Sequence, residues 1–179
     1  MKTICSRLTL SVSIIITVVS VISCSRTEQE EYLIGVSQCS DDEWRQQLNN
    51  EIRREANFHP GVRVEIRSAD DSNAKQIEDI GYFIKKNVDL LAVAPNESGP
   101  VTEIITSAVR SGIPVILMDR SIDSDEYTAF IGADNREIGR SVGQYMASVI
   151  HEGEVIELTG TEKSSPAVER SVGFREGIE

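Results

Sequence analysis

Short apolar segments alternate with amphipathic segments from residue 32 onward, and this alternation constrains the fold more than any other feature of the sequence. Buried strands separated by amphipathic helices are typical of a parallel sheet with right-handed crossovers. The pattern predicts an α/β fold in which residues 32–133 form one doubly wound lobe. The segments with the composition of buried strands are Tyr32–Ser37, Val62–Ile66, Val88–Ala94, Val115–Met118 and Ala129–Gly132.

Three helices are predicted between the first four strands, because apolar residues recur there at helical spacing. Asp42–Phe58 begins with Asp41 or Asp42 as a plausible N-cap. Asn73–Lys86 follows the second strand, and a third helix starts at a Ser98 cap. The side chains expected to face the sheet are Trp44, Leu48, Ile52 and Ala56, then Ile77, Ile80 and Ile84, then Val101, Ile104, Ile105, Ala108 and Val109.

Beyond the first lobe the sequence offers more helices than strands. Asn135–Ile150 and a segment opening at Ser165 are predicted helices, and Glu154–Leu158 is the one clear strand. A single strand has two open edges and cannot form the sheet that its helices should cover. We interpret residues 134–179 as the start of a second α/β lobe that is incomplete. The inward face of its first helix should carry Ile138, Val142, Tyr145, Met146 and Val149.

The N-terminal segment has the pattern of an export signal. A basic start with Lys2 and Arg7 precedes an uncharged apolar run, Leu8–Ile22. This run is shorter than the roughly 20 residues that span a bilayer comfortably. Cys24 ends a lipobox-like sequence and is a candidate for lipid attachment. We interpret residues 1–23 as a signal peptide or signal anchor and residues 24–31 as a tether, which predicts a membrane-tethered domain in the periplasm or cell envelope.

Charge and cysteine content exclude several classes of protein. The formal net charge is −11, and the leader contains no acidic residue, so its removal leaves a still more acidic domain. Nucleic acid is a poor partner for such a surface, because affinity for phosphate backbones depends on Lys and Arg. A neutral ligand such as a sugar is compatible with it. Three cysteines are too few for a disulfide framework, and Cys39 is expected to be a free, partly buried thiol.

Polar clusters follow three of the predicted strands, at the edge where ligands bind in open parallel sheets. They are Ser37–Trp44, Pro95–Ser98 and Asp119–Ser121. A neighbouring carboxylate and guanidinium suit a sugar, because Asp119 can accept hydroxyl protons while Arg120 donates as a planar fork. A surface ion pair between the two is the alternative.

An aromatic side chain in the first cluster could complete such a site. The Trp44 indole could stack on the apolar face of a sugar ring, although Trp44 could equally belong to the core of its helix. No His/Cys/Asp cluster has metal-ligand spacing, and no phosphate loop or nucleophile elbow is present in the sequence. We therefore expect a binding protein without metal, cofactor or catalytic site.

Several motifs together resemble type I periplasmic sugar-binding proteins of the ribose-binding class. Their order and spacing, rather than any single motif, carry the resemblance, which covers residues 32–179. A narrower set is similar to the periplasmic sensor domains of hybrid two-component receptors from Bacteroides. The broader motifs are Gly35–Ser37, Gly112–Val115 followed by Asp119-Arg120, Ile131–Asn135 and Arg170–Phe174; the narrower ones are Ile34–Arg45, Arg67–Asp71, Ala94–Glu97 and Tyr127–Asn135.

The resemblance implies a two-lobed, hinged clamp that closes on a mono- or oligosaccharide. Two departures leave the sugar's identity open. The class often has Asn where this chain has Ala94, and its Asn-rich loop before the first aromatic residue is the acidic Asp41–Glu43 here. The candidate ligand residues are Ser37, Asp41, Trp44, Asp119, Arg120 and Arg170.

Three functions remain compatible with the sequence. The first is the input domain of a receptor that signals sugar availability to a histidine kinase module, which the Gln38–Arg45 run favours. The second is a substrate-binding lipoprotein that serves the permease of a sugar importer. A LacI-like sugar-responsive repressor shares the two-lobed core but would need a basic helix-turn-helix before it. Homodimerisation is left open.

Overall fold

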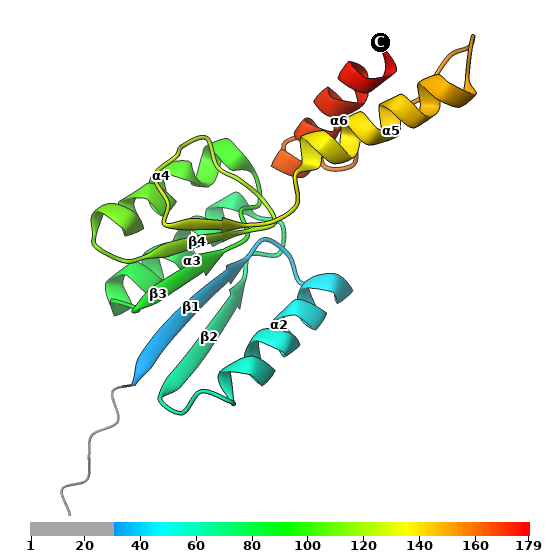
Figure 1. The fold of residues 1–179 in the computed structure, drawn as a ribbon. Coiled ribbons are helices and arrows are strands. Elements are labelled where there is room, and N and C mark those ends of the chain that lie inside the picture. Colours follow the sequence, from blue (N-terminus) through cyan, green and yellow to red (C-terminus); the bar gives the residue numbers. More distant parts are fainter. Residues whose placement is uncertain (1–30) are drawn as a thin grey trace, which may run out of the picture. The chain divides into compact units, whose positions relative to one another are not determined.

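A five-stranded parallel sheet forms the centre of the fold in the computed structural model, which describes residues 31–179 (Figure 1). All neighbouring strands are parallel, and their order is β2-β1-β3-β4-β5. The predicted α/β fold is thus confirmed. The interpretations of residues 1–23 and of Cys24 lie outside the described residues. The strands are β1 (Tyr32–Gln38), β2 (Val62–Ser68), β3 (Leu90–Val93), β4 (Val115–Met118) and β5 (Ala129–Ile131).

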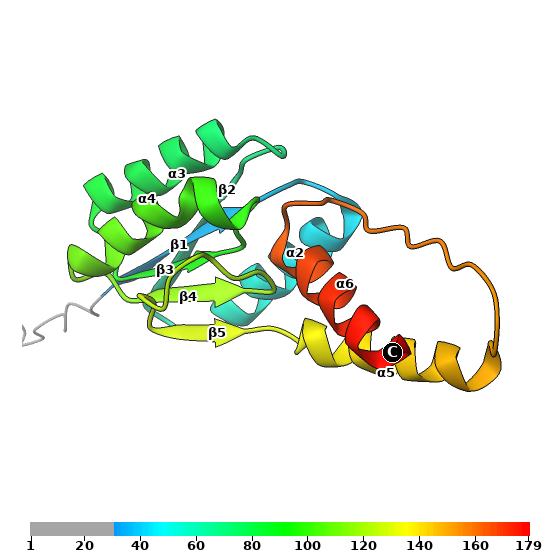
Figure 2. The same cartoon turned by 90° about the horizontal axis from the view of Figure 1, so that it is seen from above.

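Helices cover both faces of this sheet. Figure 2 shows α2 (Glu43–Ala56) on the opposite side of the strands from α3 (Asn73–Lys86) and α4 (Ser98–Arg110). One apolar cluster lies between the sheet and helices α3 and α4. Gly35 makes room in this cluster for the Phe83 ring. A Cβ at that glycine would lie 2.8 Å from Cδ1 of Phe83. The largest buried apolar side chains are Phe83, Ile80, Leu91, Ile105 and Leu117.

The buried faces of α2 and α3 differ from the prediction, because the first turns of both helices pack against the polar ends of strands. Helix α2 buries Arg45 and Asn49 there, while Trp44 is 58% exposed, so its assignment to the core is wrong. Helix α3 buries Gln76 and leaves Ile77 exposed. The apolar face predicted for α4 is confirmed.

Two smaller predictions need correction. Ser98 is the first residue of α4 rather than its cap, and its hydroxyl instead donates to the Ser121 carbonyl at 3.0 Å. Cys39 is a free thiol as expected, but it is fully rather than partly buried. Within residues 31–179, no helix combines the length and apolar character that crossing a membrane requires.

The two C-terminal helices pack directly on each other. Helices α5 (Asn135–Val149) and α6 (Ser165–Ile178) meet through glycines at four-residue spacing on both helices. A Cβ at Gly139 would lie 2.1 Å from the Arg170 carbonyl oxygen, and a Cβ at Gly173 would lie 1.9 Å from that of Arg136. The two backbones therefore touch, and only glycine fits where they do.

No strand forms at residues 154–158, which is a correction to the predicted Glu154–Leu158 strand. A strand needs a neighbour to pair its backbone groups, and none of the described residues supplies one there. The face of α5 predicted to point inward is largely exposed for the same reason. Its exposed members are Ile138, Val142, Tyr145 and Val149, while Met146 is half-buried.

An acidic side chain between two arginines links the C-terminal helices. Nε of Arg136 donates to Oε1 of Glu176 at 3.0 Å, and Nη2 of Arg140 donates to Oε2 at 3.0 Å. Hydrogen bonds from Arg136 and then from Arg140 lower the pKa of the Glu176 carboxyl from 4.5 to about 2. A carboxylate of this kind favours the folded form above its unfolded pKa and loses that effect as it becomes protonated.

Acid is therefore expected to loosen the contact between α5 and α6. The contribution of Glu176 should be complete above pH 4.5 and should disappear as the pH falls towards about 2. Amide hydrogen exchange in α6, measured at several pH values, would detect this as a loss of protection at the acid end. The Glu176→Gln variant should lack this part of the response. If that variant responded to acid as strongly as the wild type, the assignment to Glu176 would be wrong.

Candidate ligand-binding site

The polar loops after β1, β3 and β4 come together at the carboxyl edge of the sheet. The strand order reverses between β1 and β3, which is the kind of position where open α/β sheets bind ligands. The amide of Ala94 donates to the Ser37 carbonyl at 2.9 Å, so the sheet pairing extends into the loop after β3.

A buried amide side chain joins two of these loops. Gln76 is fully buried, and its Nε2 donates to the Ala94 carbonyl at 2.9 Å and to the Ser37 hydroxyl at 3.3 Å. Its Oε1 accepts the backbone N–H of Asn96 at 2.8 Å. The loop after β3 is thus held rigidly against α3. The candidate ligand residue Ser37 is fully buried, and its hydroxyl is already engaged in this network.

Arg120 contacts the loop after β3 rather than Asp119, its neighbour in sequence. Its Nη1 donates to the Asn96 carbonyl at 2.9 Å and to the Pro95 carbonyl at 3.4 Å. The alternative of a surface ion pair between Asp119 and Arg120 is therefore wrong. Because backbone carbonyls hold the guanidinium at one edge, its remaining donors keep a fixed direction.

Asp119 sits in a strained turn directly after β4. Its φ is +66°, which few residues other than glycine adopt without cost. The amide of Arg120 donates to the Met118 carbonyl at 2.7 Å, which closes a γ-turn around Asp119. Strained backbone of this sort costs about 1–3 kcal/mol and clusters at functional sites.

The carboxylate of Asp119 pairs with Arg45, a residue that the sequence analysis missed. Nη2 of Arg45 donates to Oδ2 of Asp119 at 2.8 Å, and the two side chains are 3% and 37% exposed. Nη1 of Arg45 is also buried and has no hydrogen-bond partner among residues 31–179. The guanidinium stacks 4.6 Å from the centre of the exposed Trp44 ring.

The start of α2 explains how Arg45 reaches Asp119. Asp42 rather than Asp41 caps the helix, and its Oδ1 accepts the Arg45 amide at 2.9 Å. The Ser40 hydroxyl donates to Oδ2 of Asp42, and this bond, together with the one from Arg45, lowers the pKa of that carboxyl. Asp41 is exposed. A position three residues after an N-cap is the only sequence signal for Arg45, and it carries no information about a partner 74 residues away.

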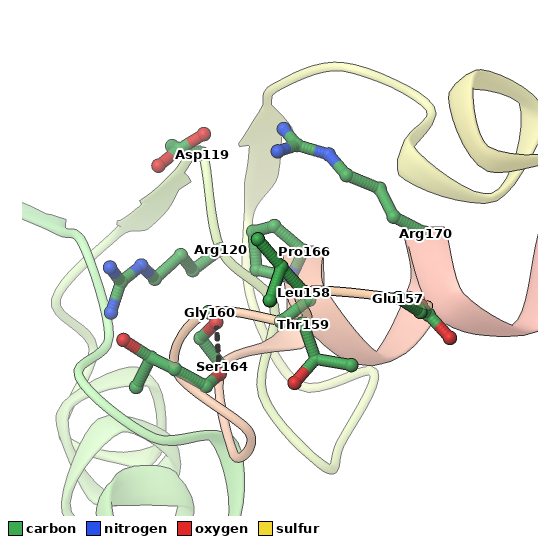
Figure 3. A pocket seen from close by; sticks show the side chains of 11 residues that line it. Asp119, Arg120, Glu157, Leu158, Thr159, Gly160, Ser164, Pro166 and Arg170 are labelled. Carbon is green, nitrogen blue, oxygen red and sulfur yellow. Dashed lines mark hydrogen bonds between the residues drawn. The ribbon is translucent and has the colours of Figure 1, made fainter. Parts of the chain in front are cut away.

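Asp119, Arg120 and Arg170 line one cavity of about 330 Å³. Figure 3 shows the first two coming from the loop after β4 and Arg170 from α6. Nε of Arg170 donates to Oδ1 of the buried Asn135 at 2.8 Å, which fixes the side chain from α5. Half of the predicted ligand residues are thus brought together, while Ser37, Asp41 and Trp44 do not line this cavity. The other lining residues include Leu158, Thr159, Ser164 and Pro166.

The cavity has the size and the polar groups for a small polyhydroxylated molecule. Ligand pockets of small molecules start at about 300 Å³. Two guanidinium groups offer planar sets of donors, and the carboxylates of Asp119 and Glu157 can accept hydroxyl protons. Within residues 31–179, no three His, Cys, Asp or Glu side chains gather in a way that could hold a metal ion. The arrangement suits recognition of hydroxyl groups.

The chain is similar in sequence and fold to known sugar-binding proteins. The model of the periplasmic binding protein domain matches residues 34–179. A solved fructose-binding periplasmic domain of a hybrid two-component system is 57% identical, with a TM-score of 0.79 over 83% of this chain and 50% of its own. A Mycobacterium smegmatis structure in complex with β-D-fucofuranose is 34% identical, with a TM-score of 0.71 over 82% of this chain and 51% of its own.

A curated sugar-binding relative is similar to this chain at lower identity. The galactofuranose-binding protein YtfQ of Escherichia coli (strain K12) is 29% identical over 171 residues, which are 92% of this chain and 54% of the relative. The chain thus spans about half the length of the curated relatives it matches.

Proposed function

Because this chain belongs to the family of periplasmic binding protein domains, we propose that it is the sugar-binding part of a sensor that reports sugar availability to a hybrid histidine kinase. The family implies a periplasmic location. The observation that carries the proposal is the convergence of Asp119, Arg120 and Arg170 on one cavity. The 57% identity to a domain of this receptor class supports the sensor role. The relatives are named as binding proteins, which agrees with a non-catalytic role.

The ligand we propose is a monosaccharide that can adopt a furanose ring, with fructose as the first candidate. One relative is a fructose-binding domain, another is solved in complex with a fucofuranose, and a third is a galactofuranose-binding protein. A furanose presents its hydroxyl groups around a small ring, which suits a cavity of about 330 Å³ that is lined by both donors and acceptors.

Calorimetric titration of the full-length protein with fructose tests this ligand. We expect saturable binding of fructose, and much weaker binding of a pyranose such as glucose. Failure of every furanose-forming monosaccharide to bind would contradict the proposed ligand class.

Residues 32–133 are proposed as the first lobe of the clamp and residues 134–179 as the start of the second. The described sheet ends at Ile131, and the helices that follow pack on each other. The exposed apolar side chains of α5, such as Val142 and Tyr145, are what a helix shows when it is built to cover a sheet. Sedimentation of the purified protein would distinguish a monomer from a homodimer.

A transport role is the second candidate, because curated relatives include import binding proteins. The partner then differs: a sensor acts on a kinase module, and a transport protein docks on a sugar permease. Sugar-dependent autophosphorylation of the full-length protein in membranes would support the sensor. Loss of sugar uptake on deletion of the gene, without loss of a transcriptional response, would favour transport.

Export is the next expectation, and the leader sequence allows a direct test. Residues 1–31 fused to alkaline phosphatase are expected to yield an active enzyme, because this phosphatase is active only after export. Cys24→Ser should release the fusion from the membrane if Cys24 carries a lipid, and should leave it attached if residues 1–23 act as an uncleaved anchor. An inactive, cytoplasmic fusion would refute export.

A further inference from the structure

We infer that Arg45 is a positioning residue of this site, which acts on the ligand through the carboxylate of Asp119. The inference rests on the proposed function, since it concerns how that ligand is held. Arg45 is nearly fully buried and does not belong to the residues that line the cavity, whereas its partner Asp119 does. A residue placed in this way can influence a ligand only by fixing the group that touches it.

The side chain of Asp119 has few other constraints. The backbone of Asp119 is held, because its amide donates to the Ile131 carbonyl and the next amide to the Met118 carbonyl, both at 2.7 Å. Among the described residues, Arg45 provides the only hydrogen bond to the carboxylate. The bond engages Oδ2 and leaves Oδ1 as the oxygen available to a sugar hydroxyl. Without Arg45, the carboxylate would rotate among several rotamers at a partly exposed position.

Arg45 is itself well fixed before any ligand arrives. Its amide is bound by the Asp42 cap, and its guanidinium stacks on the Trp44 ring. Because the side chain is buried, its rotamer freedom is already lost in the folded protein, so holding Asp119 adds little entropic cost on binding. This gives Trp44 a role at the site although it does not line the cavity, since its ring supports the guanidinium that orients the Asp119 carboxylate.

A double-mutant cycle in the full-length protein, with fructose as the probe, separates positioning from direct contact. We expect Arg45→Met to weaken binding by about ten-fold in the wild-type background and by less than about two-fold when Asp119→Ala is already present. Losses that multiply in the double variant would show that Arg45 contacts the sugar by itself, and would overturn the inference. Arg45→Lys, which retains the charge, should recover part of the affinity if Arg45→Met proves unstable.

A measurement without sugar keeps the inference testable if fructose is not the ligand. In ¹⁵N NMR spectra of the wild type, slow rotation of the paired Arg45 guanidinium should give distinct Nη signals, and Asp119→Ala should merge them. Guanidinium signals that Asp119→Ala leaves unchanged would refute the positioning role whatever sugar binds. Absence of fructose binding together with the expected NMR change would count against the proposed ligand alone.

Discussion

Replacing Asp119 with Ala is expected to weaken sugar binding by about ten- to a hundred-fold. The carboxylate lines the cavity beside the Arg120 and Arg170 guanidinium groups, where it can accept a hydroxyl proton with a full negative charge. Losing one charge-assisted hydrogen bond in a desolvated site costs about 1.5–3 kcal/mol. That loss corresponds to about one to two powers of ten in the dissociation constant. Calorimetric titration of wild type and variant with fructose measures it.

The control for this substitution is Asp125→Ala. Asp125 is exposed, follows the same strand and carries the same charge, but does not line the cavity. Its removal should leave the affinity unchanged. Asp119→Ala also deprives the buried Arg45 of its partner, so thermal unfolding without sugar must accompany the titration. A folded Asp119→Ala protein with wild-type affinity would remove Asp119 from the site.

The second large effect is expected from Gly173→Ala, a substitution outside the cavity. Alanine favours a helix over glycine by about 1 kcal/mol, so a solvent-facing position would gain stability. Here the new Cβ would lie 1.9 Å from the Arg136 carbonyl oxygen and 2.9 Å from the Arg140 amide nitrogen. Backbone atoms cannot move aside as a flexible side chain can, and such overpacking costs about 1–3 kcal/mol. The helices α5 and α6 must therefore separate.

Separation of α5 and α6 should also disturb the ligand-binding site, because α6 carries Arg170, three residues before Gly173. The bond between Arg170 and Asn135 spans the two helices and should break when they part. We expect amides of α6 to lose protection against hydrogen exchange while those of β4 keep it, and the sugar affinity to fall by about ten-fold. Gly81→Ala is the matched control: a Cβ at Gly81, within α3, meets no atom within 4 Å, so this variant should be at least as stable as the wild type. Equal behaviour of the two variants would contradict the role of the glycine contact.

Local patterns were enough to predict most of the sheet and the helices that pack on it. The strands β1, β2 and β4 and the helices α3 and α4 begin at or within a residue of where the sequence places them, because each has an apolar face that can be satisfied only against a sheet. Strand-end positions also predicted Asp119 and Arg120, since a parallel sheet brings all its carboxyl ends to one edge. Arg170 came from the motif resemblance alone, since its position in a helix gave no sign of a cavity.

The same local patterns were insufficient wherever the outcome depended on a distant partner. The Glu154–Leu158 sequence has the composition of a strand, yet a strand exists only when a neighbour pairs with it. Trp44 fits the apolar repeat of its helix, but that turn of the helix lies over polar strand ends, so Arg45 is buried there and Trp44 is exposed.

The sequence by itself determined the five strands of the sheet, the helices and which polar groups follow the strands, because these depend on residues near each other in the chain. Only the tertiary structure decided that Arg45 pairs with Asp119 and that glycines of α5 and α6 bring two backbones into contact. Both depend on distances between segments far apart in sequence. Such distances are set by how the elements pack, and no periodicity within one element encodes them.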